Sequence, residues 1–303
     1  MIGISLRQLE VFVTIAATGT VRATAERLHV TQPAISMALA ELERQLETPL
    51  FNRERGRLHL SPRGKELLPQ AQEILERVHD IQHHATERTA SLNGALRLGA
   101  SNTIGNYLVG DLLGCFVTRH PKVSLHLSVD NTHVIIQHLL NHELDVACIE
   151  GAVNHPQLQL LPWRDDTLSV CAAPDTPLAR LSRLTPDDFL DAKWILREPG
   201  SAMRTMAEQA LSVLPPGQIF LELGQVEAIK QAVIAGLGIS CLPDVATVDA
   251  VAAGRLVRLE TPFLHLRRRF SLVLHDSRYH GAVLRAFIDS LALDPPSMHA
   301  PPT

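Results

Sequence analysis

The sequence predicts an α/β protein that begins with an all-α segment, and three observations lead to this fold class. Apolar residues recur at helical spacing through most of residues 1–92. Asn93–Gly94 then interrupts the helical pattern. From Ala95 onward, apolar runs typical of strands alternate with helical patterns, an order that favours a mainly parallel sheet with right-handed crossovers.

Composition narrows the class of protein before any motif is considered. The chain has 303 residues, enough for two or three compact units, and its mean hydropathy of +0.07 is typical of a globular protein. Because no apolar run approaches the roughly 20 residues that span a bilayer, and the start does not resemble a signal peptide, we expect a cytoplasmic protein with no membrane partner. The net charge is −4, but residues 51–65 carry five basic side chains against one acidic side chain.

The segment from Thr20 to Leu39 is typical of two short helices joined by a tight turn at His29–Val30. An earlier helix closes the core beneath them, and its apolar residues are Leu6, Leu9, Phe12, Val13 and Ala16. In the second helix of the pair, Thr31 offers an N-cap hydroxyl and Pro33 fits the first turn. Its buried stripe is Ile35, Leu39, Leu42 and Leu46, which leaves Gln32, Ser36, Met37 and Ala40 facing outward.

Small and amide side chains at the start of a helix suit the major groove of DNA, where Gln pairs with adenine and Ser with either a donor or an acceptor. Residues 50–60 follow as a short basic hairpin with Gly56 at its tip, a feature typical of phosphate contact. The candidate DNA-binding residues are Thr31, Gln32, Pro33, Ser36, Met37, Arg53 and Arg55. The alternative is that the helix pair is only a packing unit and the hairpin only a solvated surface.

A long helix is predicted to begin at Ser61–Pro62, with a kink where Pro69 falls inside it. Its apolar residues follow alternating spacings of four and three: Leu67, Ala71, Ile74, Val78, Ile81 and Ala85. This narrow heptad seam indicates a linker helix that pairs with a second copy, so that DNA-binding units come in symmetric pairs. The alternative is a helix that packs on its own domain.

Residues 5–65 resemble the winged helix-turn-helix of LysR-type transcriptional regulators. The matching stretches are LRQLEVFVTIAATGT, AERLHVTQPAIS, LERQLETPLFNR and LSPRGKELL, in the family's order and spacing. Arg22, Thr24 and Met37 depart from residues common in the family, which affects the operator that is recognised. The resemblance implies a winged helix-turn-helix at 1–62 (helix-turn-helix about 20–39), a dimerising linker helix at 63–92, an effector-binding domain at 93–294 and a disordered tail at 295–303.

In the effector-binding domain, the strands are expected at 95–100, 123–129, 145–149, 168–173, 194–196, 219–223, 239–242 and 270–275. The helices are expected at 108–116, 134–140, 202–214, 227–235 and 282–291, with further helix starts at Thr185–Asp188 and at Pro243–Asp244. The family resemblance implies two Rossmann-like lobes similar to periplasmic binding proteins. Lobe I would comprise 95–163 and 266–294, and lobe II would comprise 164–265.

In open α/β sheets, ligands bind where strands end and helices begin. Three such stretches carry hydroxyl, amide or guanidinium groups that suit an anion, although plain helix capping is the alternative for each. The candidate effector-binding residues are Ser101, Asn102, Thr103, Asn131, Thr132, Glu150, Arg197, Ser201 and Arg204. Glu150 favours a ligand that also carries an amino or hydroxyl group.

SNTIGNYL, IEG and REPGS resemble one branch of the LysR family, the regulators of cysteine biosynthesis, sulfite response and carbon fixation. That branch senses small anions or metabolites. Ala202–Met203 stands where it often has Gly-Thr, which exchanges a hydroxyl for a thioether and argues against an inorganic anion.

Enzyme signatures are weak, and we expect no enzyme activity, cofactor or metal. The four cysteines (Cys115, Cys148, Cys171 and Cys241) lie in apolar patterns that favour buried thiols over a redox sensor. His138 and His142 lack the further ligands of a zinc site, so solvated histidines are the better interpretation. The sequence therefore predicts a homodimeric or homotetrameric regulator that binds double-stranded DNA, a small anionic effector and RNA polymerase. The alternative is a small-molecule-binding or enzymatic α/β protein.

Overall fold

The computed structural model describes residues 3–54, 56–85 and 92–293, and the chain divides into two compact units. The first unit comprises residues 1–92 together with 279–282, and the second comprises the remainder. The elements of the first unit are α1 (Leu6–Thr18), α2 (Val21–Arg27), α3 (Gln32–Leu46), β1 (Phe51–Glu54), β2 (Arg57–Leu60) and α4 (Pro62–Ala85).

Local capping explains where the helices of the first unit begin and end. Ser5 and Gln8 form a capping box at the start of α1, and the side chain of Thr20 accepts a hydrogen bond from the Ala23 N–H at the start of α2. His29 has a φ of 53°, so the chain reverses at the predicted turn before α3. The expected helix-turn-helix is thereby confirmed.

Three apolar side chains of α1 fill the core of the first unit, namely Val11, Phe12 and Ile15. The predicted stripe of α3 is confirmed for Ile35, Leu39 and Leu42, which are buried against them, whereas Leu46 is only partly buried. The expectation for Leu6 is wrong, because this first-turn residue is 46% exposed.

The wing and the long helix follow the predicted order. β1 and β2 pair in antiparallel fashion with Glu54 opposite Arg57, so the connecting loop contains only two residues, and Gly56 has a φ of 80°. The helix α4 continues through Pro69 to residue 85. The remainder of the predicted linker, residues 86–91, and the predicted tail lie outside the described residues.

The second unit contains the α/β domain. Its strands are β3 (Gly94–Ser101), β4 (Val123–Asp130), β5 (Val146–Glu150), β6 (Leu158–Ala172), β7 (Lys193–Leu196), β8 (Gln218–Glu222), β9 (Ser240–Pro243), β10 (Val257–Leu259) and β11 (Arg267–His275). Its α-helices are α5 (Asn102–Tyr107), α6 (Val109–Arg119), α7 (Thr132–Leu140), α8 (Ala202–Leu211), α9 (Val226–Ile234), α10 (Asp244–Ala252) and α11 (Ala282–Leu293). Two 3-10 turns, η1 (Leu178–Arg180) and η2 (Pro186–Phe189), lie between β6 and β7.

The main sheet is mixed, and the expectation of a mainly parallel sheet is wrong, because only two of the six strand pairings among the described residues are parallel. Its order is β10-β6-β11-β5-β3-β4, with β9 also paired to β6. β3 runs parallel to both of its neighbours, β4 and β5, whereas β11 runs antiparallel to both β5 and β6. The reason is that β6 follows β5 without a crossover helix, and β11 returns from the second lobe to lie between them.

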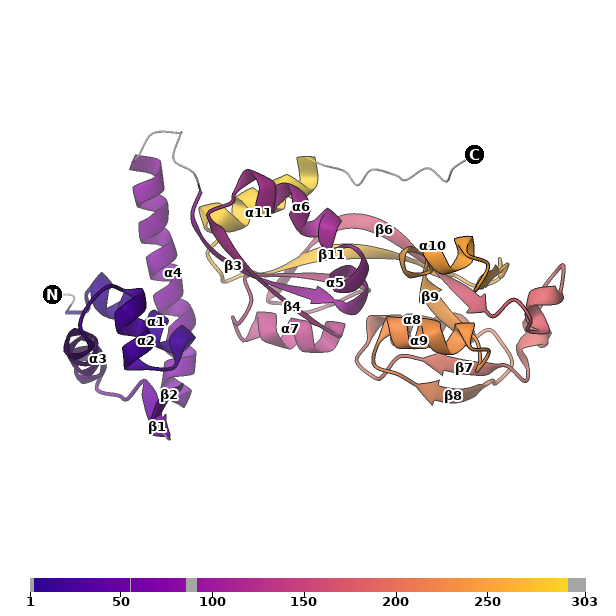
Figure 1. Cartoon of the computed structure of the whole chain (residues 1–303), viewed down its shortest axis with the longest axis horizontal. Coiled ribbons are helices and arrows are strands. Elements are labelled where there is room, and N and C mark those ends of the chain that lie inside the picture. The colour runs from indigo at the N-terminus through magenta and orange to yellow at the C-terminus, as the bar shows by residue number, and fades with distance from the viewer. Residues whose placement is uncertain (1–2, 55, 86–91, 294–303) are drawn as a thin grey trace. The chain divides into compact units, whose positions relative to one another are not determined.

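Two long strands join the lobes. β6 extends over 15 residues and spans the lobe boundary expected near residue 163, with β11 paired beside it. Figure 1 shows both strands running from the lobe that contains β3–β5 into the lobe that contains β7–β9. In the second lobe, β7 and β8 form a small parallel sheet, and a bridge between Trp194 and Ile239 connects it to the segment before β9.

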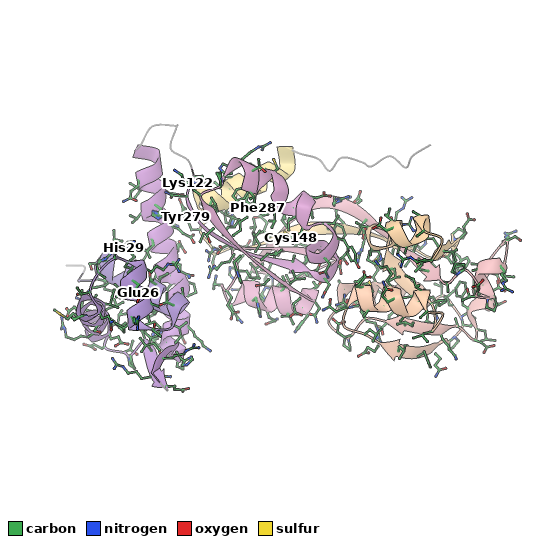
Figure 2. All side chains as sticks on the ribbon, viewed as in Figure 1. Glu26, His29, Lys122, Cys148, Tyr279 and Phe287 are labelled. Carbon is green, nitrogen blue, oxygen red and sulfur yellow. The ribbon has the colours of Figure 1, made fainter. Side chains whose placement is uncertain are left out.

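Both faces of the first lobe's sheet are covered by helices, with α6 and α11 on one face and α7 on the other (Figure 1). Phe116 of α6 meets Phe287 of α11 edge to face, with ring centroids 5.5 Å apart. Figure 2 labels Phe287. On the other face, Ile135 and Leu139 of α7 pack against Ile149. The helix start predicted at Thr185–Asp188 has its capping box but yields only the short 3-10 turn η2.

Candidate functional site

The exposed face of α3 presents the residues expected to read DNA. Gln32, Ser36 and Met37 are all exposed, and Met37 is 73% exposed although it is apolar. Thr31 is the N-cap residue, but its hydroxyl makes no capping hydrogen bond, so the role predicted for that hydroxyl is wrong. The Thr31 hydroxyl and the exposed Pro33 therefore add to the surface at the start of α3.

The wing, formed by β1 and β2, follows α3 in the chain and carries positive charge. Arg53 on β1 is exposed. Arg55 lies outside the described residues, so its contact with DNA stays a prediction. Arg63 at the start of α4 is paired with Glu66, with 2.6 Å between Nη1 and Oε2, an exposed pair of small energetic weight.

In the α/β domain, strand ends gather four polar side chains that we call the cradle: Ser101, Thr103, Glu150 and Arg268. Ser101 ends β3 and Glu150 ends the neighbouring parallel strand β5. Arg268 enters from β11, and its Nη1 lies 3.2 Å from Glu150 Oε2 while its Nη2 lies 3.4 Å from Thr103 Oγ1. All four side chains are buried, so each unmet hydrogen bond matters energetically.

Several polar atoms of the cradle have no hydrogen-bond partner among the described residues. They are Ser101 Oγ, Glu150 Oε2 and Arg268 Nη1. Buried polar groups in native proteins are normally satisfied, so three unsatisfied atoms in one place need an explanation. A bound ligand that offers both an acceptor for the guanidinium and a donor for the carboxylate would satisfy them.

A second carboxylate fixes Arg268 from the other side. Asp166 of β6 accepts a hydrogen bond from Arg268 Nε at 2.7 Å, and burial raises the pKa of Asp166. The ring of Phe270 lies beneath the guanidinium, with 5.2 Å between the Arg268 Cζ atom and the ring centroid. Arg268 is therefore held in one position by three different contacts.

A separate group of the predicted residues joins the two lobes. Asn131 caps α7 by accepting the Val134 N–H at 3.0 Å, and its Nδ2 donates to Glu198 Oε1 of the second lobe at 3.2 Å. Arg197 binds Glu198 through two hydrogen bonds of 2.7 Å, which leaves Arg197 Nη1 without a partner among the described residues. Burial acts to raise the pKa of Glu198, but the hydrogen bonds from Arg197 and its neighbours outweigh burial and lower that pKa.

The remaining predicted residues differ in whether their polar groups are free to bind a ligand. Asn102 and Ser201 are buried, and Ser201 starts α8 without a side-chain capping bond. The guanidinium of Arg204 is engaged by Glu208, Glu222 and the Arg197 carbonyl, so it is not a free anion donor. Met203 is buried in the core of the second lobe, so its thioether does not enter the site and the argument drawn from it against an inorganic anion fails.

Sequence reasoning missed Arg268, Asp166 and Glu198. The run Arg267–Arg269, directly before the strand predicted at 270–275, was the available signal, because three consecutive arginines that extend a strand place at least one side chain toward each face. Its acidic partners lie about 100 residues earlier in the chain, so only the tertiary structure shows the pairing.

The structure also shows where the histidines and cysteines lie. His142 lies against His275 with ring centroids 4.4 Å apart, and His138 lies 3.8 Å from Glu143. Cys148, Cys171 and Cys241 are buried, as expected, whereas Cys115 is only partly buried (Figure 2 labels Cys148). Within residues 3–54, 56–85 and 92–293, no cluster of three metal-ligating side chains occurs and no helix is long and apolar enough to cross a membrane.

Comparison with known proteins identifies two matching family models. Residues 6–65 match the model described as bacterial regulatory helix-turn-helix protein, lysR family. Residues 89–293 match the model described as LysR substrate binding domain. Together the two models span nearly the whole described chain.

Curated relatives and solved structures agree with these models. The chain is 38% identical to the uncharacterized HTH-type transcriptional regulator YeiE of Escherichia coli, covering 94% of this chain and 96% of the relative. It is 30% identical to the probable RuBisCO transcriptional regulator of Cyanophora paradoxa, covering 95% of this chain and 91% of the relative, which agrees with the expected carbon-fixation branch.

Among solved structures, a full-length OxyR variant from Pseudomonas aeruginosa aligns with a TM-score of 0.76 at 26% identity, covering 99% of this chain and 100% of that one. The regulatory domain of Synechocystis CcmR, solved in complex with 2-PG, aligns with a TM-score of 0.62 at 29% identity. The latter alignment covers 68% of this chain and 99% of the CcmR domain.

Proposed function

This chain belongs to the LysR family of transcriptional regulators, and on that premise we propose that a small anion bound in the cradle, where the first lobe meets the strands that join the two lobes, controls its activity. The protein is a DNA-binding regulator with an effector-binding domain and is not an enzyme.

One observation supports the effector class, namely the three unsatisfied buried atoms of the cradle. Arg268 Nη1 and the Ser101 hydroxyl donate to the anionic group of the ligand. Glu150 Oε2 accepts from it, so the ligand also carries a hydroxyl, an amino group or an acidic proton. The CcmR regulatory domain was solved in complex with 2-PG, which supports a small ligand in this fold.

The position of the cradle suggests how the ligand acts. Arg268 and Asp166 lie on β11 and β6, the strands that join the lobes, while Asn131 and Glu198 connect the lobes directly at 3.2 Å. A ligand that draws Glu150, Arg268 and Ser101 together stabilises one lobe arrangement over the other. The ligand can shift the equilibrium between the two lobe arrangements only by the difference between its binding free energies for them.

The long helix α4 supports assembly into homodimers or homotetramers. Ile74 and Ile81 are seven residues apart on the predicted seam, and they are 43% and 68% exposed in the single chain. Pairing with a second α4 would bury both side chains, and the two recognition helices of the dimer would be related by a two-fold axis. We further infer that the protein works in the cytoplasm, where the DNA lies, and that RNA polymerase is its partner at promoters.

The experiment is capture of fragmented genomic DNA by the full-length protein, followed by fluorescence anisotropy on the captured operator. We expect a short, two-fold-related operator whose affinity changes when sulfur oxyanions, phosphate, hydroxy acids or amino-acid precursors are added. An affinity that no member of this panel changes would contradict control by a small anion.

A further inference from the structure

The helix α3 carries two stripes of residues on opposite sides. The stripe that packs in the core follows spacings of four and three: Ile35, Leu39 and Leu42. A second stripe, which we call the outward stripe, begins two residues earlier and has the same spacings: Pro33, Met37 and Ala40. Because each residue turns an α-helix by about 100°, a shift of two residues places the outward stripe on the side of α3 that faces away from the core. All three of its residues are exposed.

The outward stripe is apolar, and the part of the chain that contains it is uncharged. Residues 31–40 include no acidic, basic or histidine side chain. Met37 is 73% exposed, and among the described residues no large apolar side chain is more exposed. A single exposed apolar residue needs no explanation, but Met37 lies on one line with the exposed Pro33 and Ala40. The outermost line of α3 is therefore a continuous apolar surface over its first two turns.

The major groove of DNA offers one apolar group to such a surface. Base edges in this groove present hydrogen-bond donors and acceptors, and thymine adds its C5 methyl group. Gln32 and Ser36 can pair with the donors and acceptors. The unbranched thioether side chain of Met37 is a poor hydrogen-bonding group, but its flexible chain adapts to an apolar neighbour. Thymine is therefore the base that complements Met37.

The charged residue that continues the outward stripe is not a free guanine donor. It is Arg44, four residues beyond Ala40, in the last turn of α3. Its guanidinium donates two hydrogen bonds to Glu41, of 2.8 Å from Nε and 2.5 Å from Nη2. Arginine recognises guanine through a bidentate contact of the same guanidinium group. This engagement favours a half-site in which A·T pairs face the first two turns of α3.

We propose that Met37 is a specificity-determining residue that recognises thymine, by packing its side chain against the C5 methyl group of one thymine in each operator half-site. The inference rests on the proposed contact between α3 and DNA, and it adds the chemical group that one position of the helix selects. Burying one methyl group is worth about fourfold in affinity. Gln32 and Ser36 serve hydrogen bonding to neighbouring bases.

The test is fluorescence anisotropy of the full-length protein on the captured operator, with each thymine replaced in turn by deoxyuridine. Uracil keeps the base pair and the O4 acceptor of thymine and lacks only the methyl group. We expect one position in each half-site at which this replacement weakens wild-type binding about fourfold. Met37→Ala, which alters both copies in a dimer, should bind the unmodified operator about sixteenfold more weakly and be insensitive to uracil at that position. Met37→Leu keeps an apolar side chain and should keep the sensitivity.

Gln32→Ala is the matched comparison, because it removes a polar side chain from the same exposed end of α3. It should weaken operator binding and still show the full penalty for uracil. Thermal unfolding of Met37→Ala should match wild type, since the altered side chain is exposed.

Two results would overturn the proposal while leaving α3 as the DNA-contacting helix. One is an operator in which uracil costs no affinity at any position, although Gln32→Ala still loses sequence preference. The other is a uracil penalty of the same size in Met37→Ala and wild type. A wild-type protein that captures no operator would instead contradict the proposed DNA contact of α3, and this inference with it.

Discussion

The guanidinium of Arg268 lies 3.2 Å from the carboxylate of Glu150, yet the two groups make no hydrogen bond with each other. Both side chains are almost fully buried, and Glu150 ends a strand of the first lobe while Arg268 lies on a strand that joins the lobes. A buried ion pair with unsatisfied atoms is costly, so its retention suggests a role in binding and not in stability. We interpret this pair as the part of the cradle that an effector completes.

The wing should supply affinity for DNA without choosing the sequence. Arg53 is exposed on β1, where it can contact a phosphate. We predict that Arg53→Ala weakens binding similarly on all DNA sequences and lowers the slope of log K against log salt by about one unit. Titrations at several salt concentrations measure this slope, with exposed Lys122→Ala of the other unit as a control. Equal slopes for Arg53→Ala and wild type would show that Arg53 does not contact a phosphate.

Gln32 should contribute to sequence choice. Its side chain is exposed in the first turn of α3, the part of a recognition helix that contacts base edges. We predict that Gln32→Ala costs about 1–3 kcal/mol on the captured operator and much less on random DNA. Competition anisotropy with both DNAs gives the two losses. If they are the same size, Gln32 only positions the DNA backbone.

The linker helix should hold the dimer together. Ile81 is 68% exposed on the seam of α4, so a charge placed there would be buried without a partner in the dimer. We predict that Ile81→Glu raises the dimer dissociation constant roughly a hundredfold. Sedimentation equilibrium measures it, and Gln70→Glu adds the same charge at an exposed position of α4 outside the predicted seam. An unchanged dimer in Ile81→Glu would place the interface elsewhere.

The buried cysteines should not respond to thiol reagents. Burial raises the pKa of Cys171 and of Cys241 to about 12, so near pH 8 only about one thiol in ten thousand is ionised in the folded protein. Because the folded-state pKa is raised, reactivity should increase only as the pH climbs toward that value. We predict that Cys115→Ser has no rapidly reacting thiol until guanidinium unfolds it. A fast reaction of the native variant with Ellman's reagent would contradict this.

The DNA-binding unit was predictable from local sequence because its signals are local. Thr20, Pro33 and Gly56 each mark a cap or a turn within a few residues of the element that they define. The buried stripe of α3 follows from spacing alone.

The sheet of the effector domain was less predictable because its partners are distant in the chain. Residues 162–166 contain Pro, Arg and two Asp, a composition that favours a loop, but they form the middle of β6. They stay extended because Arg268 and Arg269 of β11 pair with Asp166 and Asp165 across the ladder.

In the candidate site, too, residues marked by local sequence were predictable and residues paired across the chain were not. Strand ends and helix starts pointed to Ser101, Thr103 and Glu150. Arg268 was missed because no local spacing links residue 268 to residue 150. We therefore expect these side chains together to form one ligand site.

A thermal-shift screen of wild type against Ser101→Ala tests whether the cradle is one ligand site. The ligands are sulfur oxyanions, phosphate, amino-acid precursors and dicarboxylates, used far above their dissociation constants. At a hundredfold excess over the dissociation constant, a specific ligand should stabilise the wild type by about 2.7 kcal/mol, which raises Tm by several degrees. We predict that at least one anion with an amino or hydroxyl group does so for the wild type and has a much smaller effect on Ser101→Ala. A ligand that stabilises both proteins equally, or a panel that leaves the wild type unchanged, would contradict the cradle as the effector site.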